Sequence, residues 1–494
     1  SSTYFNGVGM QYGMGMLGSY DYKYFKQASE ENSMYYSLSN GYSREASFFA
    51  TATYSWKGRY TFNVTGRYEG SNRLGKARSA RWLPTWNVSG AWNIHEEPWF
   101  DKLRPALSHA TFKTSYSLTG DKPAITNAES IFQSFNPWRP FSADKESGIE
   151  VYSLANPDLT YEKKHEFNLG LDLGFLDNRL NVELAYYLRN NYDLIGPKIT
   201  TGEGGTIMKY ANVASMRSYG EEVTISSRNI VTKDFQWSTD FIFSHTKSKV
   251  TDLQSQKRLI NMIAGSGFTS KGYPYRALFS MDFQGLNNHG IPTFINQDGN
   301  LVTSDIDFQS YNLDHLIYEG PTDPTFSGSL GNTFSYKGLH LNVFITYAAG
   351  NKVRLDPAFS TGYSDLTAMP KEFQNRWVVP GDENHTDIPA IADYRQLQSD
   401  SYLGYAYTAY NYSHNRIAKG DFIRMKEISI AYDVPLSLIK HIGLSSMSLK
   451  LQGTNLFLIY SDKKLNGQDP EFMNSGGVAV PMARQFTFTV RLGI

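Results

Sequence analysis

Apolar and polar residues alternate one by one through several stretches of this chain. The pattern is clearest in residues 60–69, 180–187, 339–347 and 486–494. In the last of these, Phe, Phe, Val, Leu and Ile occupy every second position, and Thr, Thr, Arg and Gly lie between them. Strict alternation predicts β-strands with one apolar and one polar face. Helical candidates are few and short, such as residues 435–442, so the pattern predicts an all-β protein.

The predicted strands suit a membrane better than a soluble core. They run for about ten residues, whereas globular strands usually have five or six, and ten tilted residues cross a bilayer. Tyr54, Trp56, Tyr60 and Tyr68 lie near the ends of one predicted hairpin, where a barrel carries its aromatic girdles. We therefore expect a transmembrane antiparallel β-barrel, with a soluble β-sandwich or propeller as the alternative.

The polar face of each strand would then line a wet lumen. The lumen-facing candidates are Asn63, Arg67, Asn181, Glu183 and Arg491. For most of them, packing against another part of the protein by hydrogen bonds is favoured over substrate binding.

Short and long connections alternate along the chain, as they do in outer-membrane barrels. The tight turns are expected at Lys57-Gly58, Asp177-Asn178 and Lys337-Gly338. The long extracellular loops are expected at residues 119–163, 191–217, 249–323 and 350–420. This arrangement predicts about 14 spanning strands with the C-terminus on the short-turn side. Residues 275–283 look like a strand. Counting them as a spanning strand would put the Lys337-Gly338 turn on the wrong side of the membrane, so we expect them inside an external loop.

Composition removes several classes of function. The 47 basic and 47 acidic residues balance, so no nucleic-acid partner is expected. The chain has no cysteine, which excludes disulfides and zinc–thiolate sites. The longest apolar run is far shorter than the roughly 18 residues that a membrane helix needs.

Motifs for catalysis or metal binding are weak. Ser244 and Lys247 have the spacing of an acyl-enzyme Ser-Lys pair, but that chemistry needs a helix and this stretch predicts a strand. We therefore expect no enzyme activity, no catalytic residue and no cofactor. Four residues form a weak calcium candidate, although their order differs from an EF-hand and an ordinary turn is favoured: Asp298, Asn300, Asp305 and Asp307.

Two aromatic clusters in the expected external loops are candidates for contact with a substrate or a lid protein. They comprise Asn136, Trp138, Arg139 and Phe141 in one loop, and Trp377, Tyr394, Tyr405 and Tyr407 in another. Flat rings stack on sugar faces, and neighbouring polar groups bond to hydroxyls or amides. A well-packed loop domain with interfacial tyrosines is an equally good interpretation.

Short aromatic and glycine-rich motifs follow one another from residue 54 almost to the end of the chain. The main ones are Tyr54-Ser55-Trp56-Lys57-Gly58-Arg59-Tyr60, Gly66-Arg67-Tyr68-Glu69-Gly70, Leu83-Pro84-Thr85-Trp86, Glu96-Glu97-Pro98-Trp99-Phe100, Phe175-Leu176-Asp177-Asn178-Arg179-Leu180, Phe422-Ile423-Arg424-Met425-Lys426 and Gly453-Thr454-Asn455-Leu456-Phe457. In this order they resemble the barrel of the SusC/RagA-like TonB-dependent outer-membrane transporters.

This resemblance implies a barrel of about 22 strands around an N-terminal plug, together with a TonB box and a SusD-like surface lipoprotein that closes over the barrel as a lid. It further implies active import of oligosaccharides, or of peptides in some members. The TonB complex and the proton-motive force drive the import. The implied location is the bacterial outer membrane.

The chain departs from that plan, because plug and TonB-box signals are missing and only about 14 of some 22 strands are predicted. An incomplete barrel leaves two unpaired edges in lipid, at several kcal/mol per unsatisfied backbone group. Residues 1–494 are therefore predicted to be the C-terminal part of a longer transporter. Its expected partners are the plug and the remaining barrel strands, the TonB complex through the missing N-terminal region, outer-membrane lipid, a SusD-like lipoprotein, and an oligosaccharide or peptide. A homodimer of the transporter–lid pair is also allowed. A passive porin-like or structural barrel is the alternative, followed by a soluble glycan-binding β-protein.

Overall fold

The computed structural model describes residues 2–10, 36–104, 106–122, 130–135, 148–199, 208–254, 257–265, 267–364, 366, 368–473 and 483–493. Fourteen strands form one antiparallel sheet, called the wall here, in which neighbours in the sheet follow one another in chain order. The wall strands are β1 (Ser2–Met10), β2 (Tyr36–Trp56), β3 (Tyr60–Ser71), β4 (Trp82–Asn93), β5 (Leu107–Asp121), β8 (Glu162–Phe175), β9 (Leu180–Ile199), β10 (Met208–Val231), β11 (Phe235–Leu253), β17 (Phe326–Tyr336), β18 (Leu339–Ala349), β21 (Phe422–Asp433), β22 (Ser446–Ser461) and β23 (Gln485–Gly493). The predicted all-β fold and strand number are confirmed.

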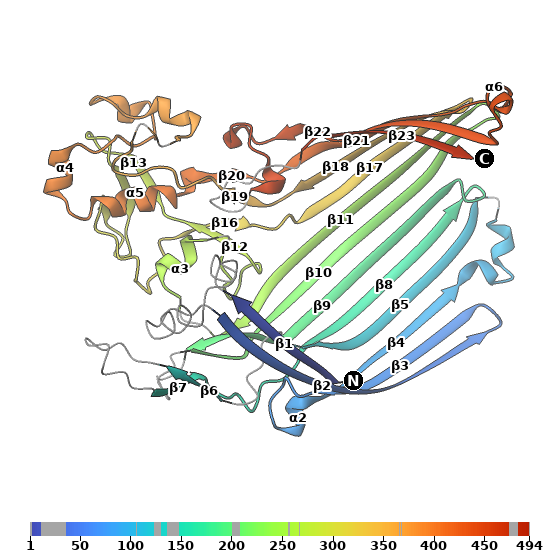
Figure 1. Cartoon of the computed structure of the whole chain (residues 1–494), viewed down its shortest axis with the longest axis horizontal. Coiled ribbons are helices and arrows are strands. Elements are labelled where there is room, and N and C mark those ends of the chain that lie inside the picture. Colours follow the sequence, from blue (N-terminus) through green and yellow to red (C-terminus); the bar gives the residue numbers. More distant parts are fainter. Residues whose placement is uncertain are drawn as a thin grey trace, which may run out of the picture.

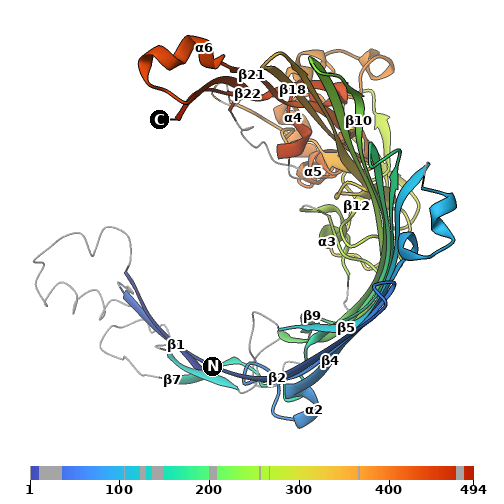
Figure 2. The ribbon, with the colours of Figure 1, turned by 90° about the vertical axis from the view of Figure 1, so that its right-hand side faces the viewer.

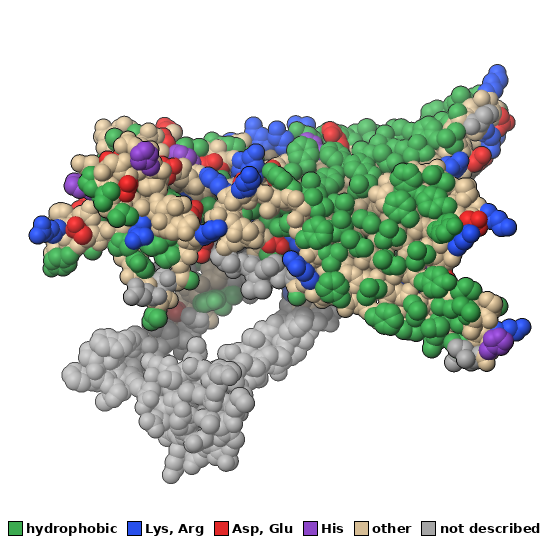
Figure 3. Space-filling view, turned by 90° about the horizontal axis from the view of Figure 1, so that it is seen from above, with side chains coloured by type: hydrophobic (Ala, Val, Ile, Leu, Met, Phe, Trp, Pro, Cys, Tyr) green, Lys and Arg blue, Asp and Glu red, His purple; other side chains and the backbone are tan. Residues whose placement is uncertain are grey.

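The wall is curved into an open arc, with β1 and β2 on one side of the opening and β22 on the other (Figure 2). Large apolar side chains cover its convex face (Figure 3). Phe62 is 56% exposed there, Leu451 55% and Phe486 73%. Such a continuous exposed apolar surface is expected where lipid takes the place of water.

Strand register explains why one whole face is apolar. Val64 pairs with Val88, Val88 pairs with Tyr116, and further along the sheet Val343 pairs with Ile428. Paired residues point to the same face of a sheet. The apolar positions of successive strands therefore merge into one band.

Aromatic rings border this band at both ends. Near the tight turns, Tyr60 stacks between Trp56 and Trp92, with ring centroids 5.8 and 6.2 Å apart. At the opposite end, His165 stacks between Tyr116 and Tyr192 at 5.7 and 5.6 Å. These rows match the girdles that barrel strands carry at the two membrane interfaces.

The three predicted tight turns are present, all at one end of the wall, where the C-terminus also lies (Figure 1). Tyr336 pairs with Leu339, so Lys337 and Gly338 form a two-residue hairpin loop with φ of 46° and 84°. Positive φ at both positions is the requirement of a type I′ turn. The turns at 57–58 and 177–178 also have positive φ throughout.

Two long loops fold together into a domain at the opposite end of the wall (Figure 1). This loop domain consists of α3 (Leu259–Ile263), β12 (Ala277–Ser280), β13 (Phe283–Leu286), β14 (Pro292–Ile295), β15 (Leu301–Val302), β16 (Ile317–Pro321), β19 (Lys352–Arg354), α4 (Tyr394–Ser399), α5 (Leu403–Asn411) and β20 (Ile417–Lys419). Its strands form small sheets of their own, β12–β16, β13–β14–β15 and β19–β20. Residues 275–283 thus lie outside the wall, as predicted.

The expected loop at 191–217 is mostly strand, which corrects the prediction. β9 continues to Ile199 and β10 already begins at Met208. Register shifts at Ala214 and Met216 absorb the irregular polar sequence while pairing continues. The hairpin can extend because bulges accommodate unpaired residues without ending the ladder.

Helices are few. The predicted helix at 435–442 appears as α6 (Leu436–Ile439) followed by a 3₁₀ turn, Lys440–Ile442. Within the described residues, the helices are all too short or too polar to cross a bilayer.

Candidate functional site

The concave face of the wall carries polar side chains. Asn63 lies between two exposed apolar residues of the convex face, Phe62 and Val64, and therefore points to the concave side. The other predicted lumen-facing residues, Arg67, Asn181, Glu183 and Arg491, alternate with apolar neighbours in the same way. They lie on β3, β9 and β23, so the wall spreads them out instead of gathering them into one cluster.

Ion pairs link neighbouring strands on the concave face. Glu166 of β8 forms ion pairs with Lys164 at 2.7 Å and with Arg189 of β9 at 3.0 Å. Lys113 of β5 pairs with Asp172 of β8. These bridges were missed from sequence, although Lys164 and Glu166 occupy alternate positions of one strand. They fix side chains on the concave face while leaving polar groups along it.

Tyr187 bridges three strands of the same face. Its ring extends over Gly220 of β10, where a Cβ would lie 2.4 Å from the ring. Its hydroxyl lies 2.7 Å from the hydroxyl of Thr246 on β11. The guanidinium of Arg189 lies over the same ring, 3.9 Å from its centroid. Gly220 is therefore required for close approach.

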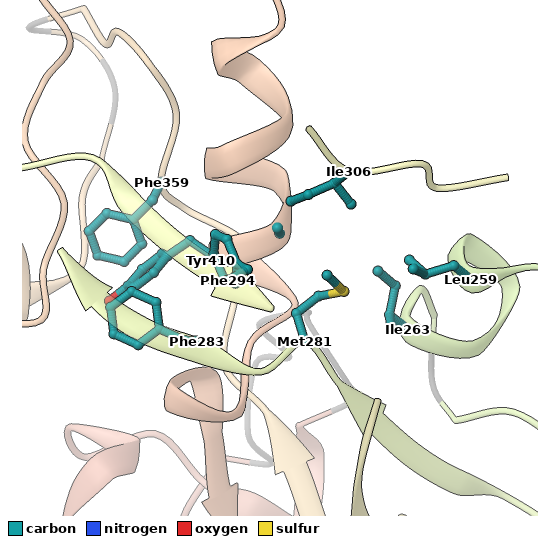
Figure 4. Packing of buried hydrophobic residues seen from close by; sticks show 9 residues of the cluster. Leu259, Ile263, Met281, Phe283, Phe294, Ile306, Phe359 and Tyr410 are labelled. Carbon is teal, nitrogen blue, oxygen red and sulfur yellow. The ribbon is translucent and has the colours of Figure 1, made fainter. Parts of the chain in front are cut away.

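The loop domain has its own hydrophobic core, drawn from both long loops (Figure 4). Its buried residues are Leu259, Ile263, Met281, Phe283, Phe294, Ile306, Phe359, Ala409 and Tyr410. Phe283 contacts Phe294 at 5.8 Å and Tyr410 at 5.4 Å between ring centroids, so residues far apart in sequence meet here. A contiguous core of this kind holds the loops in one arrangement at the end of the wall.

The predicted band of loop tyrosines divides into two groups. Tyr407 is only 2% exposed, and its hydroxyl donates to the carbonyl of Ala390. Burial raises the pKa of Tyr407, so the hydroxyl stays protonated and remains a donor. Tyr407 therefore packs the loop domain, which corrects its assignment as a contact residue.

Other predicted contact residues lie on the surface. Tyr394 is 76% exposed and Tyr405 44% exposed. Trp377 is partly buried, and its Nε1 donates to Glu383 at 2.8 Å, which fixes the ring. Trp377 also lies against Gly290, where any Cβ would be 2.6 Å from the indole. Exposed rings held by such contacts are suited to stack against a bound partner.

Buried arginines hold the loop domain together and fix the β22–β23 connection to the wall. Arg354 is 1% exposed and donates to the carbonyl of Phe279 at 2.5 Å, and burial lowers its pKa to about 10. Arg416 pairs with Glu372. On wall strand β21, Arg424 pairs with Asp469 of the β22–β23 connection. Arg424 lies in one of the family-like motifs, but nothing in the sequence indicates its partner, which lies 45 residues away.

Two further predictions concern the loops. Asn136, Trp138, Arg139 and Phe141 lie outside the described residues. The calcium candidate is not supported, because no group of three or more His, Cys, Asp or Glu within the described ranges could hold a metal ion. Asn296 explains the turn there, since its side-chain oxygen accepts from the backbone of Asp298 and Asn300 at 3.0 Å each.

Comparison with known proteins gives consistent matches. A family model described as TonB dependent receptor-like, beta-barrel matches residues 2–264. The TonB-dependent receptor P3 of Formosa agariphila is 26% identical over 448 residues, which are 86% of this chain and 42% of that protein. The TonB-dependent receptor SusC of Bacteroides thetaiotaomicron is 24% identical over 478 residues, 91% of this chain and 43% of that protein.

Solved structures agree on the fold. The RagAB peptide transporter matches with a TM-score of 0.76 and 21% identity, over 93% of this chain and 48% of the matched one. The RagAB peptide importer in its 'closed-closed' state matches with a TM-score of 0.74. This chain spans less than half the length of the curated relatives it matches.

Proposed function

Because the chain belongs to the TonB dependent receptor-like β-barrel family, we propose that it forms the C-terminal part of the wall of an active outer-membrane importer. One observation carries the proposal: the fourteen-stranded antiparallel wall has an apolar convex face, a polar concave face and a folded loop domain at one end. A structure of this kind separates lipid from a wet passage.

The two ends of the wall fit the two sides of the outer membrane. Barrels of bacterial outer membranes have short periplasmic turns and long extracellular loops. The tight turns and the C-terminus would then face the periplasm, and the loop domain would face outward. The wall alone leaves two open edges, which further strands from an N-terminal region would close. Energy from TonB would enter through a plug in the same region.

The loop domain is the proposed contact site for a SusD-like lipoprotein lid and for the substrate. Several large apolar side chains between residues 363 and 405 are exposed, and exposed apolar groups of this kind mark protein contact sites. They are Tyr363, Leu366, Val378, Val379, Tyr394, Leu397, Tyr402 and Tyr405. The second proposed contact region is the loop of Asn136, Trp138, Arg139 and Phe141.

The proposed substrate is an oligosaccharide or a peptide, both of which suit aromatic and polar side chains. The similarity to the RagAB peptide transporter supports a peptide as one of these two substrate classes. Lumen-facing Asn63, Arg67, Asn181, Glu183 and Arg491 would contact the substrate on its way or brace the plug.

Uptake by whole cells tests active import. Cells that carry or lack the full-length gene would receive fluorescent oligosaccharide and peptide pools, each with and without a protonophore. We expect gene-dependent uptake of one pool that stops when the proton-motive force is removed. Gene-dependent uptake that continues with the protonophore would instead identify a passive channel.

Copurification tests the lid. The full-length protein is extracted in detergent, and accompanying chains are identified by mass spectrometry. Changing exposed Tyr394, Tyr405 and Leu366 to Ser should reduce recovery of a lipoprotein partner at least tenfold. A matched control is Tyr311→Ser, at another exposed tyrosine of the loop domain. Equal losses in both variants would contradict a lid contact at residues 363–405.

A further inference from the structure

A hollow of about 730 Å³ opens on the convex face of the wall, near its loop end. Strands β9, β10 and β11 form its floor, and the segment around Lys271 borders it above. Leu188 pairs with Tyr219, and Tyr219 with Lys247, in the same orientation as the apolar row Leu184, Val223 and Phe243. The hollow therefore faces outward, toward lipid, and not into the passage.

The lining is strongly basic. Arg217, Lys247, Lys249 and Lys271 all border the hollow, and none of its lining residues is acidic. Arg217 and Lys249 are direct cross-strand partners. Like charges directly opposite each other destabilise a sheet, so this pairing is unfavourable unless an anion lies between them.

Other cations near this rim are paired with acidic side chains. Arg276 forms two bonds to Asp323, at 3.1 and 2.5 Å, and Lys163 bonds to Asp193 at 2.7 Å. Lys271 itself lies 3.2 Å from Asp252. Within the described ranges, however, Arg217, Lys247 and Lys249 form no ion pair.

The height of the hollow matches the lipid headgroups. On β11, Lys247 lies ten residues beyond Trp237, which stacks with Phe334 at the short-turn end. Ten residues extend about 34 Å along a strand, or about 26 Å along the membrane normal at a tilt of about 40°. The apolar band of such barrels is about 25 Å tall. The cations thus lie just above the hydrocarbon, on the side of the loop domain.

We propose that this hollow binds a phosphorylated lipid of the outer leaflet. The phosphate would lie among Arg217, Lys247 and Lys249, where the planar guanidinium can bond two phosphate oxygens at once. Its acyl chains would pack against Tyr186, Leu188 and the apolar band below. The apolar floor favours a lipid over free phosphate, because a soluble anion would make no use of it. This proposal does not depend on what the protein transports.

Native mass spectrometry of the full-length transporter in detergent tests it. The probes are lipid A carrying both phosphates and the same lipid A with its phosphates removed. The variant is Arg217→Gln, Lys247→Gln and Lys249→Gln together. The matched control, Lys57→Gln, Lys233→Gln and Lys337→Gln, removes three charges from the short-turn end. Heat-modifiable migration on gels checks that each variant is folded.

Each cation near an anionic lipid surface contributes about fivefold in affinity, so the triple variant should lose about a hundredfold at low ionic strength. The control should bind phosphorylated lipid A as the unchanged protein does, and dephosphorylated lipid A should bind weakly to all three. Equal binding by variant and control would overturn the proposal. So would equal binding of both lipids, full competition by millimolar inorganic phosphate, or occupation of this face by a second copy of the transporter.

Discussion

A single substitution in the loop-domain core should separate the stability of that domain from the stability of the wall. Phe294 on β14 is fully buried among residues from both long loops, and its ring packs against Phe283 (Figure 4). Phe294→Ala removes a complete aromatic ring from a close-packed site, which costs about 3 to 5 kcal/mol. At 1.4 kcal/mol per factor of ten, even the lower value raises the open fraction of the domain more than a hundredfold.

Limited trypsinolysis of the full-length transporter in detergent measures this opening. Lys257, Arg258 and Arg276 supply cleavage sites within the domain. When opening and closing are fast relative to cleavage, the cleavage rate follows the open fraction. We expect cleavage between residues 257 and 323 to accelerate more than a hundredfold, while heat-modifiable gel migration of the barrel stays unchanged.

The control lies on the same small sheet. Leu301 of β15 is 64% exposed and pairs with Ile295 of β14, so Leu301→Ala should change the cleavage rate less than threefold, as most exposed substitutions do. Equal acceleration in both variants would show that burial at residue 294 is not what holds the domain. Loss of the folded barrel band in Phe294→Ala would show that domain and wall unfold as one unit.

Three further changes probe the wall rim and one turn. Gly220→Ala pushes a methyl into the ring of Tyr187, breaks the hydrogen bond between Tyr187 and Thr246, and should cost about 1 kcal/mol. The barrel should then lose its folded gel migration at a lower temperature. In a Tyr187→Ala background the same substitution should cause no such loss. Asp469→Ala leaves the buried Arg424 with the partly exposed Glu471, at 2.9 Å, as its one remaining acidic partner among the described residues. The change should cost about 3 kcal/mol, measured as faster hydrogen exchange in residues 462–473. The backbone N–H groups of Val379 and Val378 donate to Asp382 and lower the pKa of its carboxyl, so the stability that the carboxylate gives is complete above the usual aspartate range near pH 4 and is lost as pH falls below it. The protease resistance of residues 377–385 should fall over the same pH range.

The strands and turns of the wall could be predicted from the sequence because each depends on neighbouring residues. Alternation of Phe486 through Leu492 is set by two neighbours on each side, and turn residues such as Lys337-Gly338 need no distant partner. Strand order then follows, since sequential strands joined by hairpins pair with each other. The exception was residues 191–217, where bulges hide a continuing hairpin from any strict period of two.

The loop domain could not be read in this way, because its structure depends on contacts across more than a hundred residues. Phe283 meets Tyr410 in the core, although neither lies in a periodic segment. For the same reason Tyr407 was wrongly predicted to contact a substrate or a lid protein, because its neighbours in sequence give no sign that it is buried. An aromatic residue in a loop is suited equally to a core and to a binding surface, and only the fold decides between them.

The hollow on the convex face could be predicted from the sequence only in part. Lys247 and Lys249 are alternate residues, so they share a face with Phe243 and belong to the lipid side of β11. On that face His245 separates the two lysines from Phe243. Lysines at this position do not suit a surface that contacts hydrocarbon, but they suit one that reaches the lipid headgroups. The register with Arg217 adds what sequence could not, because it places a third cation directly opposite Lys249. A charge cluster that destabilises the bare sheet is then best understood as half of a site whose other half is anionic lipid.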